Sequence, residues 1–304
     1  MMFLRNVPNI NFMDRRRIAF IISGTLVLLS LILLSVRGLN LGIDFKGGTV
    51  FQFTLAKSAQ VSDVRSVLSR FGLGNSVIQK ASDGSFVVKA KSLGRETQLK
   101  IFNALKKKFG GINILRIESV GPVIGKELRR QAFIALILAL GGILIYITLR
   151  FKFDFAVVSV LALIHDSLIV LGAYSLLWKE INLPFIAAIL TIVGYSLNDT
   201  IVVLDRVREN LRAASRKFDY KTLINMSINQ TLSRTINTSL TTLLPVLTLY
   251  LFGGEVLSNF ALALLLGIIV GTYSSIYVAG ALLVEWNLRK KAKGRSPALR
   301  TTRA

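Results

Sequence analysis

The hydrophobic positions of this chain of 304 residues are concentrated in six long apolar runs, which polar segments separate. An α-helix needs about 20 apolar residues to cross the hydrocarbon core of a bilayer, so each run predicts a membrane-spanning helix. The six expected spans are residues 18–36, 131–149, 155–178, 183–204, 235–252 and 260–284. The pattern therefore predicts a bundle of six transmembrane helices.

The polar segment 37–130 has a different periodicity and predicts a separate small domain outside the membrane. Strands are expected at 47–55, 76–81, 84–91 and 112–120, and amphipathic helices at 61–72 and 95–110. The apolar faces of the two helices are expected to be formed by Val61, Val64, Leu68 and Phe71, and by Leu99, Phe102, Leu105 and Phe109. The order βαββαβ is that of a ferredoxin-like α+β domain.

Lysines and arginines set the expected orientation, because cytoplasmic loops carry an excess of both. They cluster before the first run, between the fourth and fifth runs, and after the sixth, whereas the short loops on the other side hold Lys179, Glu180 and Glu255. Both termini are therefore expected in the cytoplasm. The expected parts are a cytoplasmic N-terminus 1–17, span 18–36, external domain 37–130, spans 131–204, cytoplasmic connection 205–234, spans 235–284 and a basic cytoplasmic tail 285–304.

The cytoplasmic connection has its own pattern. Apolar residues line one side of segment 206–233, at Val207, Leu211, Ala214 and Phe218. This spacing predicts a basic amphipathic helix that lies along the cytoplasmic face of the membrane.

Composition supports a membrane protein and excludes several other classes. Apolar residues make up 52% of the chain, and its formal charge of +22 is concentrated beside the apolar runs rather than in an aromatic-interleaved nucleic-acid-binding motif. The chain has no cysteine, which excludes disulfides, thiol catalysis and cysteine-ligated metals. The run after Arg15–Arg17 is too long for a signal-peptide core and predicts an uncleaved anchor. No cofactor or metal is expected.

Two ionisable residues, His165 and Asp166, fall near the middle of the third span. Asp166 lies twelve residues beyond Asp154, which is about 18 Å at the rise of an α-helix. Ionisable side chains at this depth are costly and often functional. The pair is either a proton relay or gate, or a structural hydrogen bond between helices in which both groups are neutral.

The stretch TIVGYSLNDTIVVLDRVREN (191–210) places Asn198 and Asp199 at the end of the fourth span. Asp199 lies about 9 Å along the helix from Asp205, which marks the cytoplasmic interface. Burial disfavours a charged carboxylate, and Arg234 at the start of the fifth span is placed to offset this. Asp199 is therefore either a protonatable group whose charge decides its pairing with Arg234, or part of a static ion pair or interhelical hydrogen bond.

Glycines mark the start of the external domain, in LGIDFKGGT (41–49). Gly42, Gly47 and Gly48 permit unusual backbone conformations, and Asp44 is a polar residue near the lipid surface. The motif is either a fixed elbow between domain and membrane or an ordinary turn into the first strand. A second motif, GPVIGKE (121–127), is not a nucleotide-binding loop, because its second glycine comes too early and Glu127 replaces the magnesium-binding hydroxyl residue.

The last run carries small residues at intervals of four, at Ala263, Gly267, Gly271, Ser275 and Ala279. Such a stripe lets two helices approach closely and predicts helix packing.

Several motifs occur in the order found in one family of export proteins. These are LGIDFKGGT, HDS at residues 165–167, GYSLNDTIVVLDRVREN, SRTINTS, LYLFGG at 249–254, and GTYSSIYVA at 271–279. Together they resemble the SecF branch of the SecD/SecF family of protein-export membrane proteins, within the resistance-nodulation-division superfamily. The resemblance covers residues 15–285, and the small external domain favours SecF over SecD.

The resemblance implies a transport subunit of the bacterial cytoplasmic (inner) membrane, not an enzyme. Members of this family pair with SecD, associate with the SecYEG channel, and use the proton motive force to help draw unfolded secreted polypeptides outward; YajC is a further candidate partner. The carboxylate of the fourth span and the arginine of the fifth carry proton coupling, at Asp199 and Arg234 here. Asn198, His165 and Asp166 complete the candidate set. Lipid is an expected contact and nucleic acid is not.

Two other functions remain open. One is half of a proton-coupled exporter of small hydrophobic molecules, which predicts a substrate cleft and a much larger external portion. The other is a passive translocon scaffold, which predicts that Asp199 tolerates neutral substitution.

Overall fold

The computed structural model describes residues 9–81, 83–214 and 219–294, which divide into two compact units. The helical unit comprises the residues up to Asn40, Leu136–Lys179 and the residues from Pro184 onward. The sheet unit comprises Leu41–Ala135 together with Glu180–Leu183.

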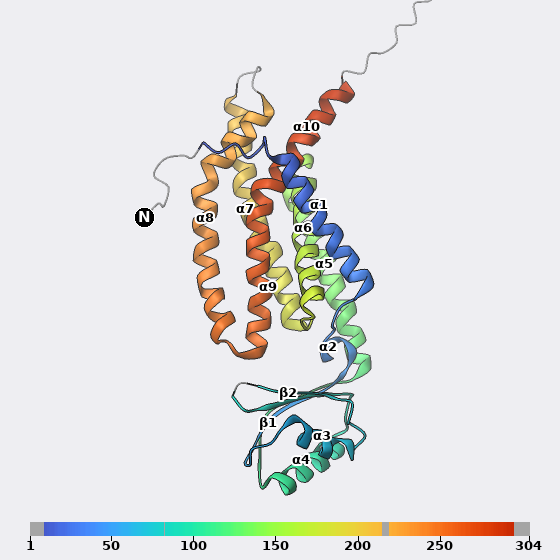
Figure 1. Ribbon diagram of the computed structural model, residues 1–304. Helices are drawn as coiled ribbons and strands as arrows, with labels where there is room; N and C mark the ends of the chain where they lie inside the picture. Colours follow the sequence, from blue (N-terminus) through green and yellow to red (C-terminus); the bar gives the residue numbers. More distant parts are fainter. Residues whose placement is uncertain (1–8, 82, 215–218, 295–304) are drawn as a thin grey trace, which may run out of the picture. The chain divides into compact units, whose positions relative to one another are not determined.

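Long helices form nearly all of the helical unit (Figure 1). They are α1 (Arg16–Val36), α5 (Pro122–Arg150), α6 (Phe153–Leu177), α7 (Leu183–Ala213), α8 (Tyr220–Phe252), and the continuous series α9 (Gly254–Tyr273), η1 (Ser274–Ala279) and α10 (Gly280–Gly294). The segment η1 is a π-helix, whose hydrogen bonds join residues five apart. Six stretches of the described chain are long and apolar enough to cross a membrane, which confirms the six predicted spans.

The predicted interfacial helix over 206–233 is wrong. Instead, α7 continues to Ala213 and α8 begins at Tyr220, capped by the Asp219 side chain. Val207 is fully buried, and Leu211 and Ala214 pack against the same cluster, so this apolar face packs inside the protein rather than on lipid. Phe218 lies outside the described residues.

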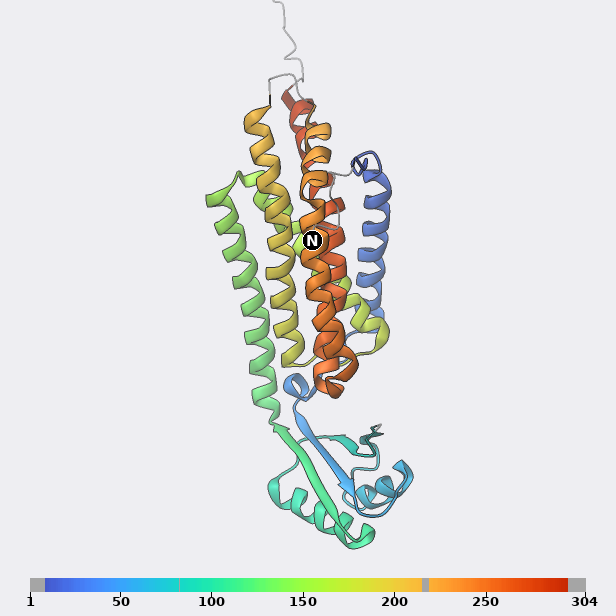
Figure 2. The same ribbon diagram turned by 90° about the vertical axis from the view of Figure 1, so that its left-hand side faces the viewer.

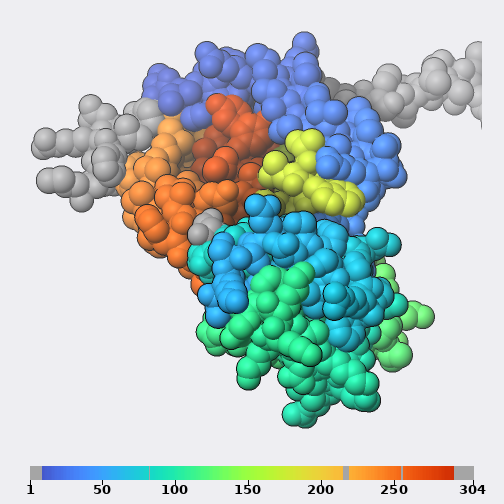
Figure 3. Space-filling model, turned by 60° about the horizontal axis from the view of Figure 1, so that its bottom comes forward, coloured from blue at the N-terminus to red at the C-terminus, as the bar shows by residue number. Residues whose placement is uncertain are grey.

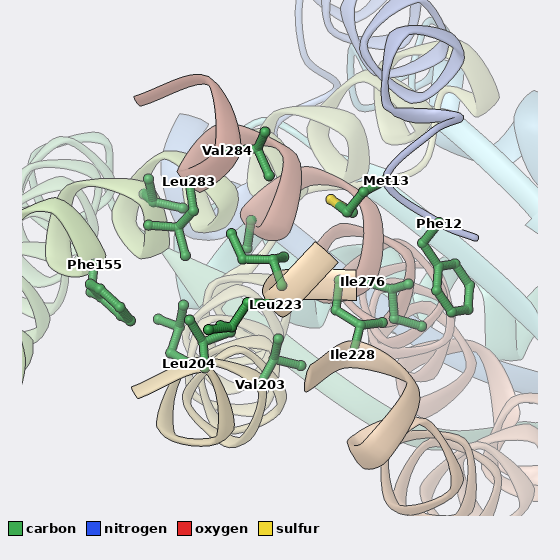
Figure 4. Close-up of a cluster of buried hydrophobic side chains, with 14 of the residues drawn as sticks. Phe12, Met13, Phe155, Val203, Leu204, Leu223, Ile228, Ile276, Leu283 and Val284 are labelled. Carbon is green, nitrogen blue, oxygen red and sulfur yellow. The ribbon is translucent and has the colours of Figure 1, made fainter. Parts of the chain in front are cut away.

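A cluster of aliphatic and aromatic side chains holds these helix ends together (Figure 4). It joins the segment before α1 to α6, α7, α8, η1 and α10. Members labelled in the figure are Phe12, Met13, Phe155, Val203, Leu204, Leu223, Ile228, Ile276, Leu283 and Val284. Burial of each large apolar side chain contributes about 1.5–3 kcal/mol, so this cluster fixes how α7 and α8 meet.

The sheet unit has the predicted order of strands and helices. After the short helix α2 (Ile43–Lys46) come β1 (Gly48–Leu55), α3 (Val61–Ser69), β2 (Val77–Lys80), β3 (Phe86–Ala90), α4 (Arg95–Phe109) and β4 (Ile112–Val120). The strands form one antiparallel sheet in the order β2-β3-β1-β4, with β1 and β4 side by side (Figure 2). Figure 3 looks onto the helix side of the unit, where α3 and α4 form the surface.

The core of the sheet unit lies between the sheet and these two helices. Phe51, Phe53 and Phe86 bring their rings together on the helix-facing side of the sheet. On α4, Phe102 and Phe109 are buried as predicted, but Leu99 is 55% exposed and Ile101 is fully buried in its place. Leu105 is fully buried as predicted too, so the predicted face of α4 is wrong only at Leu99.

Candidate proton-coupling site

The carboxyl group of Asp199 is buried in the middle of α7, where the residue is 2% exposed. Its Oδ1 accepts a 3.3 Å hydrogen bond from the Thr238 hydroxyl of α8. Its Oδ2 is buried and has no hydrogen-bond partner among the described residues. A charged carboxylate with an unmatched buried oxygen is unfavourable, and a proton on that oxygen relieves the cost.

The small-residue stripe of α9 brings α9 close to this part of α7. A Cβ on Gly267 would lie 2.3 Å from Ile192 side-chain atoms, and one on Gly271 would lie 2.9 Å from the Cβ of Ser196. Glycine is therefore required for this approach. The prediction of close helix packing is confirmed at these two positions of the stripe.

Asn198 and Arg234 lie on the exposed side of the same helices. Both residues are exposed, and both line an open hollow of about 580 Å³ between α7 and α8. Asp205, Arg206 and Glu209 of α7 line the same hollow toward the end of the helix. The hollow thus offers a polar approach to the helix turn that carries Asp199.

Arg234 does not form an ion pair with Asp199 in this structure. Within the described residues, no carboxylate oxygen lies within 4.0 Å of a nitrogen of Arg234. The Thr238 hydroxyl that donates to Asp199 is also within 3.0 Å of the Arg234 carbonyl oxygen, one helical turn earlier. The predicted pairing of Arg234 with Asp199 stays a prediction.

A second buried polar cluster surrounds Asp166 on α6. Its Oδ1 lies 2.9 Å from Nδ1 of His165, and its Oδ2 accepts hydrogen bonds of 2.6 Å from Ser196 of α7 and 2.8 Å from Ser274 of η1. Nε2 of His165 is buried without a hydrogen-bond partner among the described residues. The cluster ties three helices to one carboxylate, and the structure leaves both predicted roles for this pair open.

Two serines and a threonine of this site were not assigned a role from the sequence. Ser196 and Ser274 donate to Asp166, and Thr238 donates to Asp199. All three stand inside motifs that carry the family resemblance, in GYSLND, GTYSSIYVA and SRTINTS. Their hydroxyls are common in helices, however, so periodicity gives no reason to single them out.

The glycine motif is far from this cluster along the chain and forms its own set of contacts inside the sheet unit. Gly47 and Gly48 have φ angles of 75° and 152°, which other residues rarely adopt. Gly42 packs against Glu180, and Asp44 Oδ2 accepts a 2.8 Å hydrogen bond from the backbone amide of Leu183. These contacts hold the motif within the sheet unit, and its role as an elbow between domain and membrane stays a prediction.

The described part of the chain contains no group of three or more histidine, cysteine, aspartate or glutamate side chains that could hold a metal ion. Its buried acids are instead surrounded by hydroxyl groups and by histidine, which can accept, donate or hold protons.

Comparison with known proteins identifies the family. Residues 100–289 match the family described as "Protein export membrane protein SecD/SecF, C-terminal", and residues 32–59 match the "SecD/SecF GG Motif". The chain belongs to the SecD/SecF family. Both matches together include every candidate site residue on α6, α7 and α8 and the whole glycine motif. The chain is therefore a multi-pass membrane protein that takes part in protein transport.

Relatives of the chain are named as subunits SecF or SecDF of the protein translocase. The protein translocase subunit SecF of Desulfurispirillum indicum is 48% identical over 290 residues, which cover 92% of each chain. SecF of Pseudomonas aeruginosa is 43% identical, with 93% of each chain covered. The protein translocase subunit SecDF of Thermus thermophilus is 46% identical over 96% of this chain but only 40% of its own length.

The fold agrees with a solved member of the family. The crystal structure of SecDF, a translocon-associated membrane protein from Thermus thermophilus, matches 94% of this chain and 40% of that chain, with a TM-score of 0.86 and 45% sequence identity. The chain thus spans about two-fifths of that fused protein.

Proposed function

We propose that this chain is the SecF-type subunit of the bacterial Sec machinery, and that with SecD it uses the proton motive force to promote late steps of protein translocation through SecYEG. The names of its relatives support this role, as does the likeness to a translocon-associated structure. It resides in the cytoplasmic (inner) membrane. YajC, lipid and the unfolded polypeptide are further contacts of the assembled complex.

A partner of the SecD type is supported by the length of the fused relative and by the exposed surface of the spans. Three-fifths of the Thermus thermophilus SecDF chain has no counterpart here. Asn198 and Arg234 are exposed on the spans, where lipid offers no hydrogen bonds to their side chains. Helices of a second subunit would satisfy them, as in transporters built from two related halves. The small sheet unit disfavours an exporter of small molecules.

Asp199 is the proposed proton acceptor, and its unmatched buried oxygen is the observation that carries this role. Arginine does not deprotonate, so the proton must bind the acid. When Asp199 is charged, it attracts the Arg234 guanidinium of α8; when it is protonated, this attraction is lost. The proton cycle therefore changes the force between α7 and α8. Asn198 in the same hollow, and His165 with Asp166 behind α7, are the next candidates on the proton route.

The decisive experiment replaces Asp199 by asparagine and measures export of a reporter precursor with and without an imposed proton gradient. Asp199→Asn keeps the size of the side chain but not its titration, so the complex should assemble and lose its response to the gradient. Asp219→Asn is the matched control, since it makes the same chemical change outside the spans. A normal response of Asp199→Asn would refute the proposal and favour a passive scaffold.

The sheet unit is proposed to be a ferredoxin-like domain on the outer face of the membrane. Its strand order and the basic ends of α7, α8 and α10 support this placement. Because the chain has no cysteine, single cysteines can be labelled selectively. A membrane-impermeant maleimide should label Lys91→Cys but not Arg212→Cys on spheroplasts. Labelling at position 212 would reverse the orientation.

A further inference from the structure

The start of α7 is held inside the sheet unit by side-chain and backbone contacts. Leu183, the first residue of α7, donates its amide hydrogen to Asp44 Oδ2 at 2.8 Å. The amide of Gly42 donates to the Ile181 carbonyl oxygen at 2.8 Å, and Leu41 forms a parallel bridge with Ile181. Segment Glu180–Leu183 accordingly belongs to the sheet unit, although the rest of α7 does not.

An ion pair and a close approach strengthen this attachment. The Lys89 side chain on β3 pairs with Glu180. A Cβ on Gly42 would lie 2.6 Å from Oε1 of Glu180 and 3.2 Å from the Ile181 carbonyl oxygen, so a side chain here would displace the Glu180 carboxylate. The loop before α7 is therefore bound to the sheet unit by charge, by backbone hydrogen bonds and by shape.

The same motif also holds the start of α5. A Cβ on Gly47 would lie 2.9 Å from the Cα of Pro122, and a Cβ on Gly125 would lie 3.0 Å from the amide nitrogen of Gly47. Pro122 and Gly125 stand in the first turn of α5. One short motif thus contacts the first residues of two spanning helices.

A carboxylate is well suited to the start of α7. The first amides of a helix lack partners within the helix, and its N-terminus carries partial positive charge. Pro184 follows Leu183 and has no amide hydrogen, so the amide of Leu183 is the first donor of the helix. Asp44 satisfies that donor from another segment of the chain, so the hydrogen bond also links α7 to that segment.

We propose that Asp44 is a positioning residue of the proton-driven cycle, and that it ties the first turn of α7 to the sheet unit so that movement of α7 reaches this unit directly. Asp199 lies 16 residues further along the same continuous helix, about 24 Å at the helical rise. The inference rests on the proposed function, since it supplies the route by which a change at Asp199 leaves the membrane. The route then passes through α7 itself.

The first test is Asp44→Ala compared with Asp44→Asn, each in the full chain assembled with its SecD-type partner. Asparagine keeps an acceptor oxygen for the Leu183 amide, and alanine does not. Asp44→Ala should reduce gradient-driven export of a reporter precursor about tenfold, leave gradient-independent export unchanged, and assemble normally. Asp44→Asn should stay within about threefold of the parent. For each variant, the ratio of gradient-driven to gradient-independent export separates a loss of coupling from a general loss of folded protein.

A disulfide can then replace the missing link. Leu41 and Ile181 are bridge partners, close enough for an engineered cysteine pair, and the chain has no other cysteine. With Asp44→Ala, the closed Leu41→Cys/Ile181→Cys disulfide should restore gradient-driven export, and reduction should abolish it again. In the parent, closing the disulfide should leave export unchanged. The cysteine-free parent controls for the reductant.

Three outcomes would overturn the inference: full coupling in Asp44→Ala, failure of the closed disulfide to restore it, or loss of export when the disulfide closes in the parent. The last outcome would mean that this junction must open during the cycle. Because this outcome is measured in the parent, it tests the inference even if Asp44→Ala fails to assemble. Asp199→Asn is measured in parallel. If its export still responds to the gradient, the proposed function itself fails. If Asp199→Asn loses this response while Asp44→Ala keeps it, only the role of Asp44 is removed.

Discussion

The Ser196 hydroxyl donates a 2.6 Å hydrogen bond to Oδ2 of Asp166 from the helical turn just before Asp199. The buried acids of α6 and α7 are therefore joined through one turn of α7. Any rotation of α7 that moves Asp199 also moves Ser196 and alters the environment of Asp166.

Ser196→Ala should destabilise the protein, because it leaves a buried carboxylate one hydrogen bond short. Loss of such a bond costs about 1–3 kcal/mol. Ser159→Ala is the matched control: Ser159 is also fully buried on a spanning helix, but its hydroxyl donates to the Phe155 carbonyl oxygen of its own helix. Unfolding of the detergent-solubilised protein should show a larger loss for Ser196→Ala. Equal losses would mean that the bond to Asp166 contributes little.

Gly267→Val should force α9 away from α7, since even a Cβ would lie 2.3 Å from Ile192 side-chain atoms. Overpacking of this kind costs about 1–3 kcal/mol. Ile192→Ala in the same chain makes room and should recover part of the thermal stability lost. Gly24→Ala is the control, because nothing lies within 4 Å of its added Cβ. Simple additivity of the two changes at 192 and 267 would contradict direct contact.

Arg234→Lys should weaken the response of export to a proton gradient without removing it. Lysine keeps the positive charge in the hollow but loses the planar fork that binds a carboxylate at two points. Arg234→Ala should abolish the response. Arg208→Lys makes the same exchange at the end of α7 and should leave export unchanged. If Arg234→Ala couples normally, the charge of Asp199 is read by another residue.

Stability should depend on the charge of Asp219, which caps α8. Hydrogen bonds from the hydroxyl and amide groups of Thr222 lower the pKa of Asp219 below its ordinary value. Because the folded pKa is depressed, this stabilisation is complete above the unfolded pKa of about 3.9 and is lost as pH falls through the folded value.

Unfolding measured from pH 6 to pH 3 tests this point. Asparagine is an equally good cap but does not titrate, so Asp219→Asn should show a shallower loss of stability below pH 4 than the parent. Asp219→Ala should cost about 0.5–2 kcal/mol at neutral pH. Identical acid profiles for the parent and Asp219→Asn would show that other carboxylates control this range.

Apolar runs were enough to predict the spans, and the same runs single out the acids within them as candidates. Asp199 and Asp166 stand out because a charged residue inside an apolar run is rare. Helix ends are harder: Val207 and Leu211 repeat as in an interfacial helix, yet they join a buried cluster that includes residues of α8 and α10. Periodicity shows that a face is buried but not whether protein or lipid covers it.

Partners across the fold could not be predicted for the same reason. Asp44 and Leu183 are 139 positions apart, and their contact depends on how two segments meet in space. Leu99 and Ile101 both fit an apolar face of α4, and only the packing against the sheet decides that Ile101 is the buried one. Local spacing contains neither kind of information.

The π-helix η1 changes the phase of the last spanning helix. An ordinary α-helix turns by about 100° per residue, and a π turn takes in one residue more, so the faces before and after it point in different directions. Gly267 and Gly271, before this turn, face α7, and Leu283 and Val284, after it, join the cluster that contains α8. A single span thereby serves as two differently oriented half-helices, and deleting one residue from η1 would turn one half out of register with its neighbours.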